Sequence, residues 1–542
     1  MALPGQPVMP PGVKIGKPGV SMLDNAPMHP LSTASVHGPD LGPAPFSLSE
    51  GLAGVLTGQA RQRPQALALV FGDQSWTYAD LQHATDRAVR HLRGCGVRAG
   101  DRVAYLGLNH AAQLIGLFAL ARMGAMLVPL NFRLAPAEWG KVLDDCTPVA
   151  LWHDPAWAEA AQALARQHHL PCGAVQTWLQ APSETASTAL TPTEALPDLQ
   201  EAPVLLVYTS GTTGLPKGAV HTQANLLANM QAAAEVQAMT PQDRVLTVLP
   251  LFHVGGLCIQ TLPALWAGAS VCLMPRFEPA TMLNAVAQWR PSLTLVVPAV
   301  MKALLEHPQW HDTDWRALRA VWAGSSTLPT AAVQAFMDRG VPLCNVYGAT
   351  ETGPFSVALS PAHAVSHLGD CGWPAPGVAL CLAPSMKTAS DGVGELWLKG
   401  PAIVQRYWPD HPALDAQGWF HSGDLAQQGA DGSWRIVGRA KDMVISGGEN
   451  IYPAEIENLL AQHPAVAECA VLGQSDARWG EVVVAVVVLH PDVQPSPSDD
   501  ELLATVRQDL ARYKHPRRVV RVNALPKTAL GKVQKDALRA QL

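Results

Sequence analysis

The 542-residue sequence predicts an α/β protein with a large amino-terminal α/β domain of several subdomains and a small carboxyl-terminal α+β domain. Strand-like and helix-like segments alternate from about Phe46 without an internal repeat, as in α/β folds. Several apolar strand-like runs end abruptly in small and polar residues. After about Gly429 the pattern changes to a hairpin followed by short mixed elements. We therefore expect a tail over residues 1–45, a large domain over 46–440 and a small domain over 441–542.

The composition is that of a soluble globular protein, because 48% of the residues are apolar, 15% are charged and the formal net charge is -6. It gives no reason to expect nucleic acid binding. The nine cysteines form no CxxC pair, which favours reduced thiols. The amino terminus lacks the apolar core of a signal peptide, and no later apolar run reaches the ~18 residues of a membrane span. We expect a cytoplasmic protein with a disordered Pro/Gly-rich tail.

The individual elements follow from local signals. A helix should begin after Thr77, where Asp80 lies three residues on, and should end at the glycines before Val97. A basic run over residues 512–521 lies beside alternating valines and is best explained as a solvated strand edge. Buried strands are expected in "RVAYLG" (102–107), "AMLVPL" (125–130), "APVLLVYTS" (202–210) and "VPLCNVYGATE" (341–351).

The stretch "YTSGTTGLPKGAV" (208–220) concentrates glycines, hydroxyls and a lysine after one of these strands. Glycines let backbone amides approach an anion and hydroxyls add donors, so we expect a phosphate-binding loop that leads into a helix. It is not the P-loop pattern, because the position five residues after Gly211 is Pro216. The candidate phosphate ligands are Thr209, Ser210, Gly211, Thr212, Thr213, Gly214 and Lys217.

This stretch resembles the phosphate signature of the adenylate-forming superfamily, which contains acyl- and aryl-CoA ligases, peptide adenylation domains and luciferases. Five further motifs of that superfamily follow in order, and the resemblance covers about nine tenths of the chain. Taken together, the motifs are most similar to those of the fatty-acyl and 4-coumarate ligase branch. The motifs are "LPLFHVGGL" from Leu249, "NVYGATETG" from Asn345, "GWFHSGDLA" from Gly418, "GRAKDMVISGGENIYPAEIE" from Gly438 and "PKTALGKVQK" from Pro526.

The resemblance implies a site for ATP and Mg²⁺. Thr350 would contact phosphate and Glu351 would help to coordinate magnesium. Asp424 would accept hydrogen bonds from the ribose hydroxyls, since a carboxylate can accept two bonds at once, and Arg439 would contact ribose and phosphate. Tyr347 would stack on adenine, with Asn345 and Ser325 nearby.

Lys532 matches the lysine that reaches the substrate carboxylate and the α-phosphate, where its ammonium would offset the developing negative charge. Lys441 matches the hinge about which the small domain rotates between the two half-reactions. Gly447 and Gly448 would line the pantetheine path of coenzyme A. Taken alone, each of these residues would be an ordinary surface or turn residue.

The chain ends ten residues after Lys532 without a carrier module, so coenzyme A is the expected acceptor. His253 stands where amino-acid-activating domains place an aspartate, and we expect it to form a pocket wall or gate. "AGSST" (323–327) and "QRYW" (405–408) depart from the usual pattern; the first leaves adenine and acyl contacts open, and the second is expected to be structural. Space for a hydrophobic acid is expected beside Gly255, Gly256, Gly324, Val254, Leu257, Val297 and Val300.

The sequence leaves the acid open among medium-chain or long-chain fatty acids, cinnamate-like acids and other aryl acids. The expected partners are a small carboxylic acid, ATP and coenzyme A. Another acceptor, a luciferase-like oxidation or a non-catalytic scaffold remain alternatives, and the oligomeric state is open.

Overall fold

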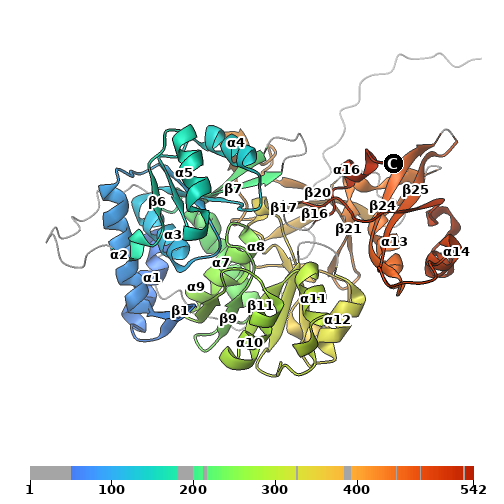
Figure 1. Ribbon diagram of the computed structural model, residues 1–542, viewed down its shortest axis with the longest axis horizontal. Helices are drawn as coiled ribbons and strands as arrows, with labels where there is room; N and C mark the ends of the chain where they lie inside the picture. The colour runs from blue at the N-terminus through green and yellow to red at the C-terminus, as the bar shows by residue number, and fades with distance from the viewer. Residues whose placement is uncertain are drawn as a thin grey trace, which may run out of the picture. The chain divides into compact units, whose positions relative to one another are not determined.

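The computed structural model describes residues 50–180, 199–210, 216–324, 328–383, 392–446, 449–476, 478–528 and 532–542 (Figure 1). The expected tail over residues 1–45 lies outside these ranges. Four β-sheets organise the described chain, and two of them are large.

The larger sheet has nine strands in the order β15-β14-β13-β12-β11-β9-β10-β1-β2. Its central strands are parallel, from β13 across to β1. Their carboxyl ends therefore lie at one edge, where ligands of open α/β sheets collect. The strands are β1 (Leu67–Phe71), β2 (Gln74–Thr77), β9 (Arg244–Thr247), β10 (Ser270–Leu273), β11 (Leu293–Val296), β12 (Ala320–Gly324), β13 (Leu343–Tyr347), β14 (Val357–Ala358) and β15 (Trp373–Pro374).

The second sheet has eight strands in the order β19-β18-β8-β7-β4-β3-β5-β6. Strands β7 and β8 form an antiparallel hairpin. The strands are β3 (Arg102–Leu106), β4 (Met126–Leu130), β5 (Ala150–His153), β6 (Cys172–Ala174), β7 (Pro203–Ser210), β8 (Pro216–Thr222), β18 (Arg406–Tyr407) and β19 (His411–Pro412).

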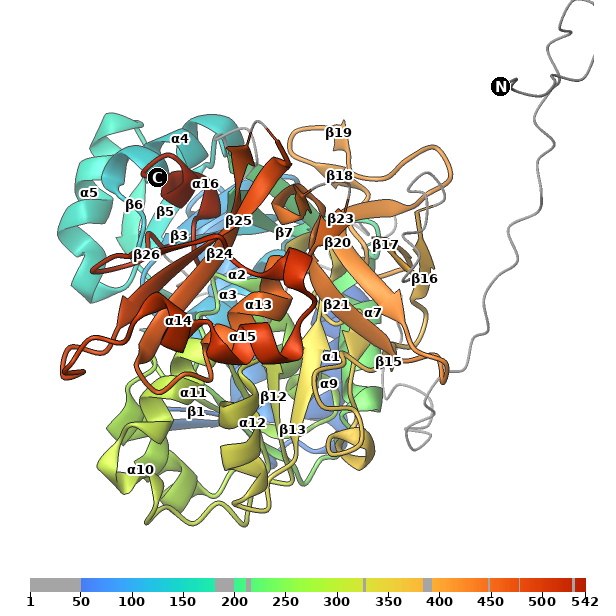
Figure 2. The same cartoon turned by 90° about the vertical axis from the view of Figure 1, so that its right-hand side faces the viewer.

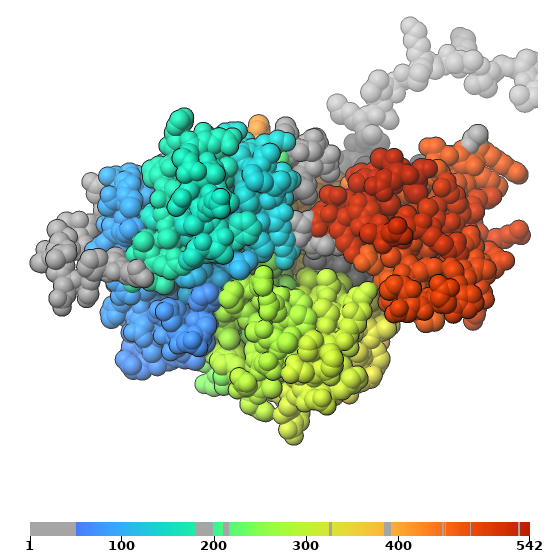
Figure 3. Space-filling view, in the orientation of Figure 1, coloured from blue at the N-terminus to red at the C-terminus, as the bar shows by residue number. Residues whose placement is uncertain are grey.

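A layer of helices contacts strands of both large sheets and carries most of the apolar core. Other helices contribute to the molecular surface, such as α4 and α5 in Figure 3. The inner layer consists of α1 (Gly51–Gln62), α2 (Tyr78–Gly94), α3 (Ala111–Met123), α7 (Gln223–Val236) and α9 (Leu262–Trp266). The remaining helices of these sheets are α4 (Pro136–Cys146), α5 (Ala158–Gln167), α6 (Thr177–Gln180), α8 (Val254–Gly256), α10 (Pro279–Trp289), α11 (Pro298–Leu305) and α12 (Thr330–Met337).

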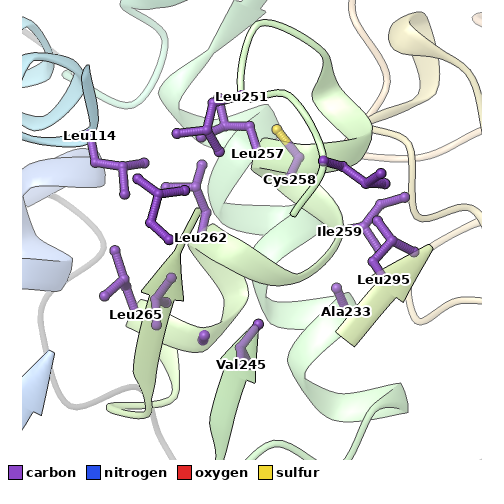
Figure 4. Close-up of a cluster of buried hydrophobic side chains, with 14 of the residues drawn as sticks. Leu114, Ala233, Val245, Leu251, Leu257, Cys258, Ile259, Leu262, Leu265 and Leu295 are labelled. Atoms are coloured by element: carbon purple, nitrogen blue, oxygen red, sulfur yellow. The ribbon is translucent and has the colours of Figure 1, made fainter. Parts of the chain in front are cut away.

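Helix α8 continues into the π-helical turn η3 (Leu257–Thr261) and then into α9. This continuous segment places Leu257, Cys258 and Leu262 in the apolar core, within the side-chain cluster that includes Val245 of β9 (Figure 4). A π-helical turn is rare and frequently marks a functional site. Helix α8 is the last part of the "LFHVGG" motif, and η3 directly follows it.

The carboxyl-terminal part of the chain contains the two smaller sheets. The four-stranded sheet contains β16 (Ala379–Leu382), β17 (Val393–Lys399), β20 (Phe420–Gln428) and β21 (Trp434–Arg439). The chain passes through the short turn η7 (Ala440–Asp442) into the five-stranded sheet, where helices pack beside β24 and β25 (Figure 2). That part comprises β22 (Val444–Ser446), β23 (Glu449–Ile451), α13 (Pro453–Leu460), β24 (Val466–Asp476), β25 (Gly480–Leu489), α14 (Asp499–Leu502), α15 (Ala504–Asp509), β26 (Arg518–Arg521) and α16 (Lys535–Arg539).

The structure confirms most of the local predictions. Thr77 caps α2 in a reciprocal capping box with Asp80, and the predicted hairpin is formed by β20 and β21. The basic run ends in β26, a strand that pairs with β25. One expectation is wrong: the 208–220 stretch does not lead directly into a helix. It joins the antiparallel strands β7 and β8, and α7 begins only at Gln223.

Within the described ranges, no helix combines the length and the apolar character that a membrane crossing requires.

Candidate active site

The turn after β13 presents Thr350 and Glu351 at the carboxyl edge of the nine-stranded sheet. Both residues lie in the 3₁₀ turn η5 (Thr350–Thr352) and are half-buried. The turn folds so tightly that a Cβ on Gly348 would lie 2.1 Å from the Pro354 carbonyl oxygen. Gly353 has a φ of +86°, a conformation that favours glycine. The glycines of "YGATETG" are therefore needed to place Thr350 and Glu351 where they lie.

A buried carboxylate lies beside this turn. Asp424 on β20 is 6% exposed. Its Oδ2 accepts a hydrogen bond of 2.8 Å from the Tyr347 hydroxyl at the end of β13, and its Oδ1 lies 2.8 Å from Nε of Arg439 on β21. Burial and the neighbouring Asp424 carboxylate raise the pKa of Tyr347 well above its ordinary value, so the tyrosine stays a neutral donor. The structure thus brings Asp424, Arg439 and Tyr347 together.

Glu351 also contacts a tyrosine that the motifs did not assign to the site. The Tyr407 hydroxyl on β18 donates to Oε1 of Glu351 at 3.1 Å. The ammonium of Lys217 on β8 lies 5.5 Å from the centre of the same tyrosine ring. Tyr407 belongs to "QRYW", and it lies between the candidate phosphate lysine and the candidate magnesium carboxylate. The structural role expected for the departure of "QRYW" from the usual pattern stays a prediction.

The backbone of β18 explains how Tyr407 reaches this position. Tyr407 pairs with Ala219 of β8, and the Trp408 amide donates to the Gly218 carbonyl at 2.7 Å. Gly218 leaves room for this pairing, since a Cβ there would lie 2.8 Å from a Leu206 methyl group, which would have to shift. The only sequence signal for Tyr407 was an aromatic pair in a motif that departs from the usual pattern.

The phosphate loop is described at its two ends. Thr209 Oγ1 lies 3.4 Å from the Lys217 carbonyl oxygen, and these two residues face each other across the hairpin. Ser210 is the last residue of β7. Four of the predicted ligands lie outside the described residues: Gly211, Thr212, Thr213 and Gly214.

Lys532 lies within electrostatic range of the Asp424 cluster. Although the residue is exposed overall, partial desolvation lowers the pKa of its ammonium, and Arg439 lowers it further while Asp424 and Asp442 oppose the shift. Its backbone amide donates to Oγ1 of Thr528 at 3.2 Å. The structure therefore brings the predicted lysine and the predicted ribose ligand to one region.

Lys441 lies in η7, between the two smaller sheets. Its ammonium is 3.1 Å from Oδ2 of Asp536 on α16, and both side chains are substantially exposed. An exposed ion pair of this kind contributes little to stability, so it leaves the turn free to change conformation. Gly447 and Gly448 lie outside the described residues.

His253 caps the short helix α8, with its Nδ1 accepting from the Gly255 amide at 3.2 Å. Burial, assisted by the charge of Arg133, lowers the pKa of His253 to about 4, so the imidazole is neutral at neutral pH. A neutral imidazole can form a pocket wall without a counter-charge. Its predicted gating role remains a prediction.

The prediction that glycines make space for the acid needs a correction at two positions. A Cβ on Gly256 would lie 2.3 Å from the Pro250 carbonyl oxygen, and one on Gly324 would lie 2.4 Å from the Val346 carbonyl oxygen. These two glycines accommodate backbone rather than an acid. Gly255 differs, since the nearest atom to its added Cβ is Nδ1 of His253 at 3.3 Å.

Asn345 lies on β13 beside β12. Its amide nitrogen donates to the Asp370 carbonyl oxygen at 3.2 Å and contacts Sγ of Cys371 at 3.3 Å. These contacts hold the side chain close to Tyr347, on the same strand. Ser325, which follows β12, lies outside the described residues.

Comparisons with known proteins identify the family of the chain. The family model of the AMP-binding enzyme matches residues 56–408, and that of the AMP-binding enzyme C-terminal domain matches residues 455–532. The chain belongs to the AMP-binding enzyme family. This confirms the adenylate-forming, acyl-CoA synthetase-like class that the motifs indicated.

Individual relatives fall in the same class. The chain is 40% identical to an indoleacetate–CoA ligase of Aromatoleum aromaticum, over 88% of this chain and 95% of that protein. It is also 40% identical to a feruloyl-CoA synthase of Amycolatopsis, over 91% of this chain and 99% of that protein.

A solved relative is the o-succinylbenzoate CoA synthetase of Bacillus subtilis, at 30% identity. Its complex with an acyl-adenylate intermediate superposes with a TM-score of 0.79 and covers 90% of this chain and 97% of that chain. A second structure of it contains ATP and a magnesium ion, with a TM-score of 0.77. These neighbours confirm the predicted fold class.

Proposed function

We propose that this protein is an ATP-dependent, AMP-forming carboxylic acid–CoA ligase that works through an acyl-adenylate. The observation that carries the proposal is the cluster of Asp424, Tyr347 and Arg439 with Lys532 in electrostatic range. A buried carboxylate that already accepts two hydrogen bonds is held in a fixed orientation and keeps acceptor capacity for a diol.

In the first half-reaction the acid carboxylate attacks the α-phosphorus of ATP and pyrophosphate leaves. Both reactants are anions, so positioning and charge neutralisation supply most of the acceleration. Asp424 binds the ribose, Arg439 orients ribose and phosphate, and Lys217 and the β7–β8 loop hold the outer phosphates. Lys532 offsets the negative charge that develops between the carboxylate and the α-phosphate.

The residues present fit a magnesium ion. Glu351 offers a hard oxygen ligand whose orientation is set by the Tyr407 hydroxyl. Magnesium is usually held by one or two carboxylates together with substrate phosphates, and Glu351 beside the Thr350 hydroxyl matches that pattern. When bound, the ion neutralises phosphate charge.

In the second half-reaction the thiol of coenzyme A attacks the acyl carbon and AMP leaves. The thiol needs the space that Lys532 occupies beside the carboxylate, so the small domain must move. We assign the hinge to Lys441 in η7, with domain boundaries at residues 440 and 441. The weak ion pair of Lys441 with Asp536 supports this assignment.

We propose an aryl acid as the substrate. Indoleacetate and ferulate, the acids in the names of the two relatives at 40% identity, both carry an aromatic ring. The side chains around α8 and β11 are apolar, which favours contact with such a ring. We place the reaction in the cytoplasm, where ATP and coenzyme A are available and where the nine free cysteines would stay reduced.

The test is a panel of aryl and fatty acids assayed for AMP and pyrophosphate with and without coenzyme A. The proposal predicts pyrophosphate release with an aryl acid and thioester formation only with coenzyme A. Absence of AMP and pyrophosphate across the panel would refute it. Oxygen-dependent turnover of the adenylate would instead indicate a luciferase-like oxidation.

A further inference from the structure

The π-helical turn η3 lines a small cavity at the carboxyl edge of the nine-stranded sheet. The cavity has a volume of about 10 Å³, and its walls come from η3, from the ends of β9 and β11 and from the residues after β9. Polar walls are contributed by Gln260, Thr247 and Thr261. A volume of this size holds about one water-sized group.

One acceptor in this cavity wall has no partner. Gln260 is 2% exposed, and its Oε1 forms no hydrogen bond with any described residue. The two hydroxyls beside it are already engaged, since Thr247 and Thr261 lie 2.8 Å apart and Thr261 donates to the Gly256 carbonyl at 2.6 Å. A buried acceptor without a donor is destabilising and requires an explanation.

The orientation of the Gln260 amide follows from its neighbours. The Gln237 amide nitrogen donates to the Ile259 carbonyl oxygen at 2.8 Å, and a carbonyl oxygen can only accept. The Gln237 oxygen must therefore accept from the Gln260 amide nitrogen, at 2.9 Å. Rotating the Gln260 amide would place two acceptors face to face. The atom without a partner is thus the oxygen, and it belongs to a residue that lines the cavity.

The place of the cavity relative to the nucleotide site follows from the strand order. Strands β12, β11 and β9 are consecutive neighbours, and the site residues of β13 lie beyond β12 at the same edge. Neighbouring strands are about 4.8 Å apart, so the ends of β12 and β9 are about 10 Å apart. An acid whose carboxylate lies beside β12 and β13 would direct its distal end toward β9 and β11. Leu295 of β11 and Ile259 of η3 belong to the same side-chain cluster there (Figure 4).

We propose that Gln260 determines specificity by accepting a hydrogen bond from a donor group at the distal end of an aryl acid. This inference rests on the proposed function and specifies its substrate class: an acid whose ring carries a hydroxyl or N–H group far from the carboxylate. The small volume admits the donor atom alone, so the ring remains in the apolar region outside the cavity. An acid that ends in a methyl group would leave the Gln260 oxygen without a partner.

The test compares acids that differ only in the donor. Pyrophosphate release gives kcat/KM for 4-hydroxycinnamate against 4-methylcinnamate, and for indole-3-acetate against benzofuran-3-acetate. We expect the wild-type protein to prefer the donor-bearing acid about tenfold in at least one pair, the effect of one buried neutral hydrogen bond. Equal kcat/KM values within both pairs would overturn the inference, because a resident water would then satisfy Gln260.

The residue itself is tested with Gln260→Met. This variant should bring the ratio of kcat/KM between the donor-bearing acid and its partner close to one. Thr294→Val is the matched control, since Thr294 is a fully buried threonine on β11 whose hydroxyl donates to the Leu246 carbonyl at 2.8 Å. It should keep the preference. If Gln260→Met does not fold, a Gln237→Met/Gln260→Met double variant removes both partners together. A preference that survives in the folded variant would overturn the assignment. Failure of the proposed function is distinct, since no acid would then release pyrophosphate.

Discussion

Tyr407→Phe removes one hydroxyl and keeps the ring beneath Lys217. The hydroxyl donates to Oε1 of Glu351 at 3.1 Å, which is longer than the usual ~2.7–2.8 Å of an O–H···O bond. Hydrogen bonds to charged groups contribute about 1.5–3 kcal/mol, and the long distance favours the lower end. About 1.4 kcal/mol corresponds to tenfold in an equilibrium constant. We therefore expect the apparent affinity for Mg²⁺ in adenylation to fall about tenfold, so that half-maximal activity needs about ten times more Mg²⁺.

The assay measures pyrophosphate release against free Mg²⁺ at a fixed ATP concentration. Binding of Mn²⁺ in the presence of a non-hydrolysable ATP analogue, followed by electron paramagnetic resonance, gives an independent readout. Tyr208→Phe is the matched control, because the Tyr208 hydroxyl also donates to a carboxylate, that of Asp145, away from Glu351. The reasoning is refuted if Tyr407→Phe stays within twofold of the wild type in both measurements.

Two further predictions concern the hinge and the core. Lys441→Pro should slow thioester formation more than adenylation, because a fixed φ restricts the rotation about η7; separate assays of the two half-reactions check this, and equal slowing would contradict it. His221 is fully buried on β8, its ring nitrogens have no hydrogen-bond partner among the described residues, and burial lowers its pKa to about 4. The unfolded histidine binds a proton below about pH 6.5, so the folded state should lose about 2 kcal/mol between pH 7 and pH 5 from this group. His221→Leu should remove that part of the pH dependence in denaturant titrations, and an unchanged dependence would exclude the assignment.

The sequence predicted those parts of the site whose residues are close together in the chain. Thr350 and Glu351 could be placed because their strand and turn are contiguous in the chain. The pairing of Asp424 with Tyr347 joins residues 77 positions apart, and only the motif order of the family indicated it. Such contacts are set by tertiary packing, which local patterns do not encode.

The failed predictions have the same origin. The helix expected directly after the phosphate loop is a strand, because "PKGAVHT" pairs with β7 and so completes a sheet. Gly256 and Gly324 were assigned to an acyl pocket, but carbonyl groups from other segments occupy the positions of their missing side chains. Tyr407 was overlooked because its contact with Glu351 spans 56 residues.

The central claim is that Lys532 acts in the adenylation step and is dispensable for the transfer to sulfur. Lys532→Ala should reduce pyrophosphate release from acid and ATP by about 100-fold or more, the effect of removing one charge-stabilising donor. Thioester formation from the synthesised acyl-adenylate and coenzyme A should stay within a few-fold of the wild type. An equal loss in both half-reactions would contradict the account.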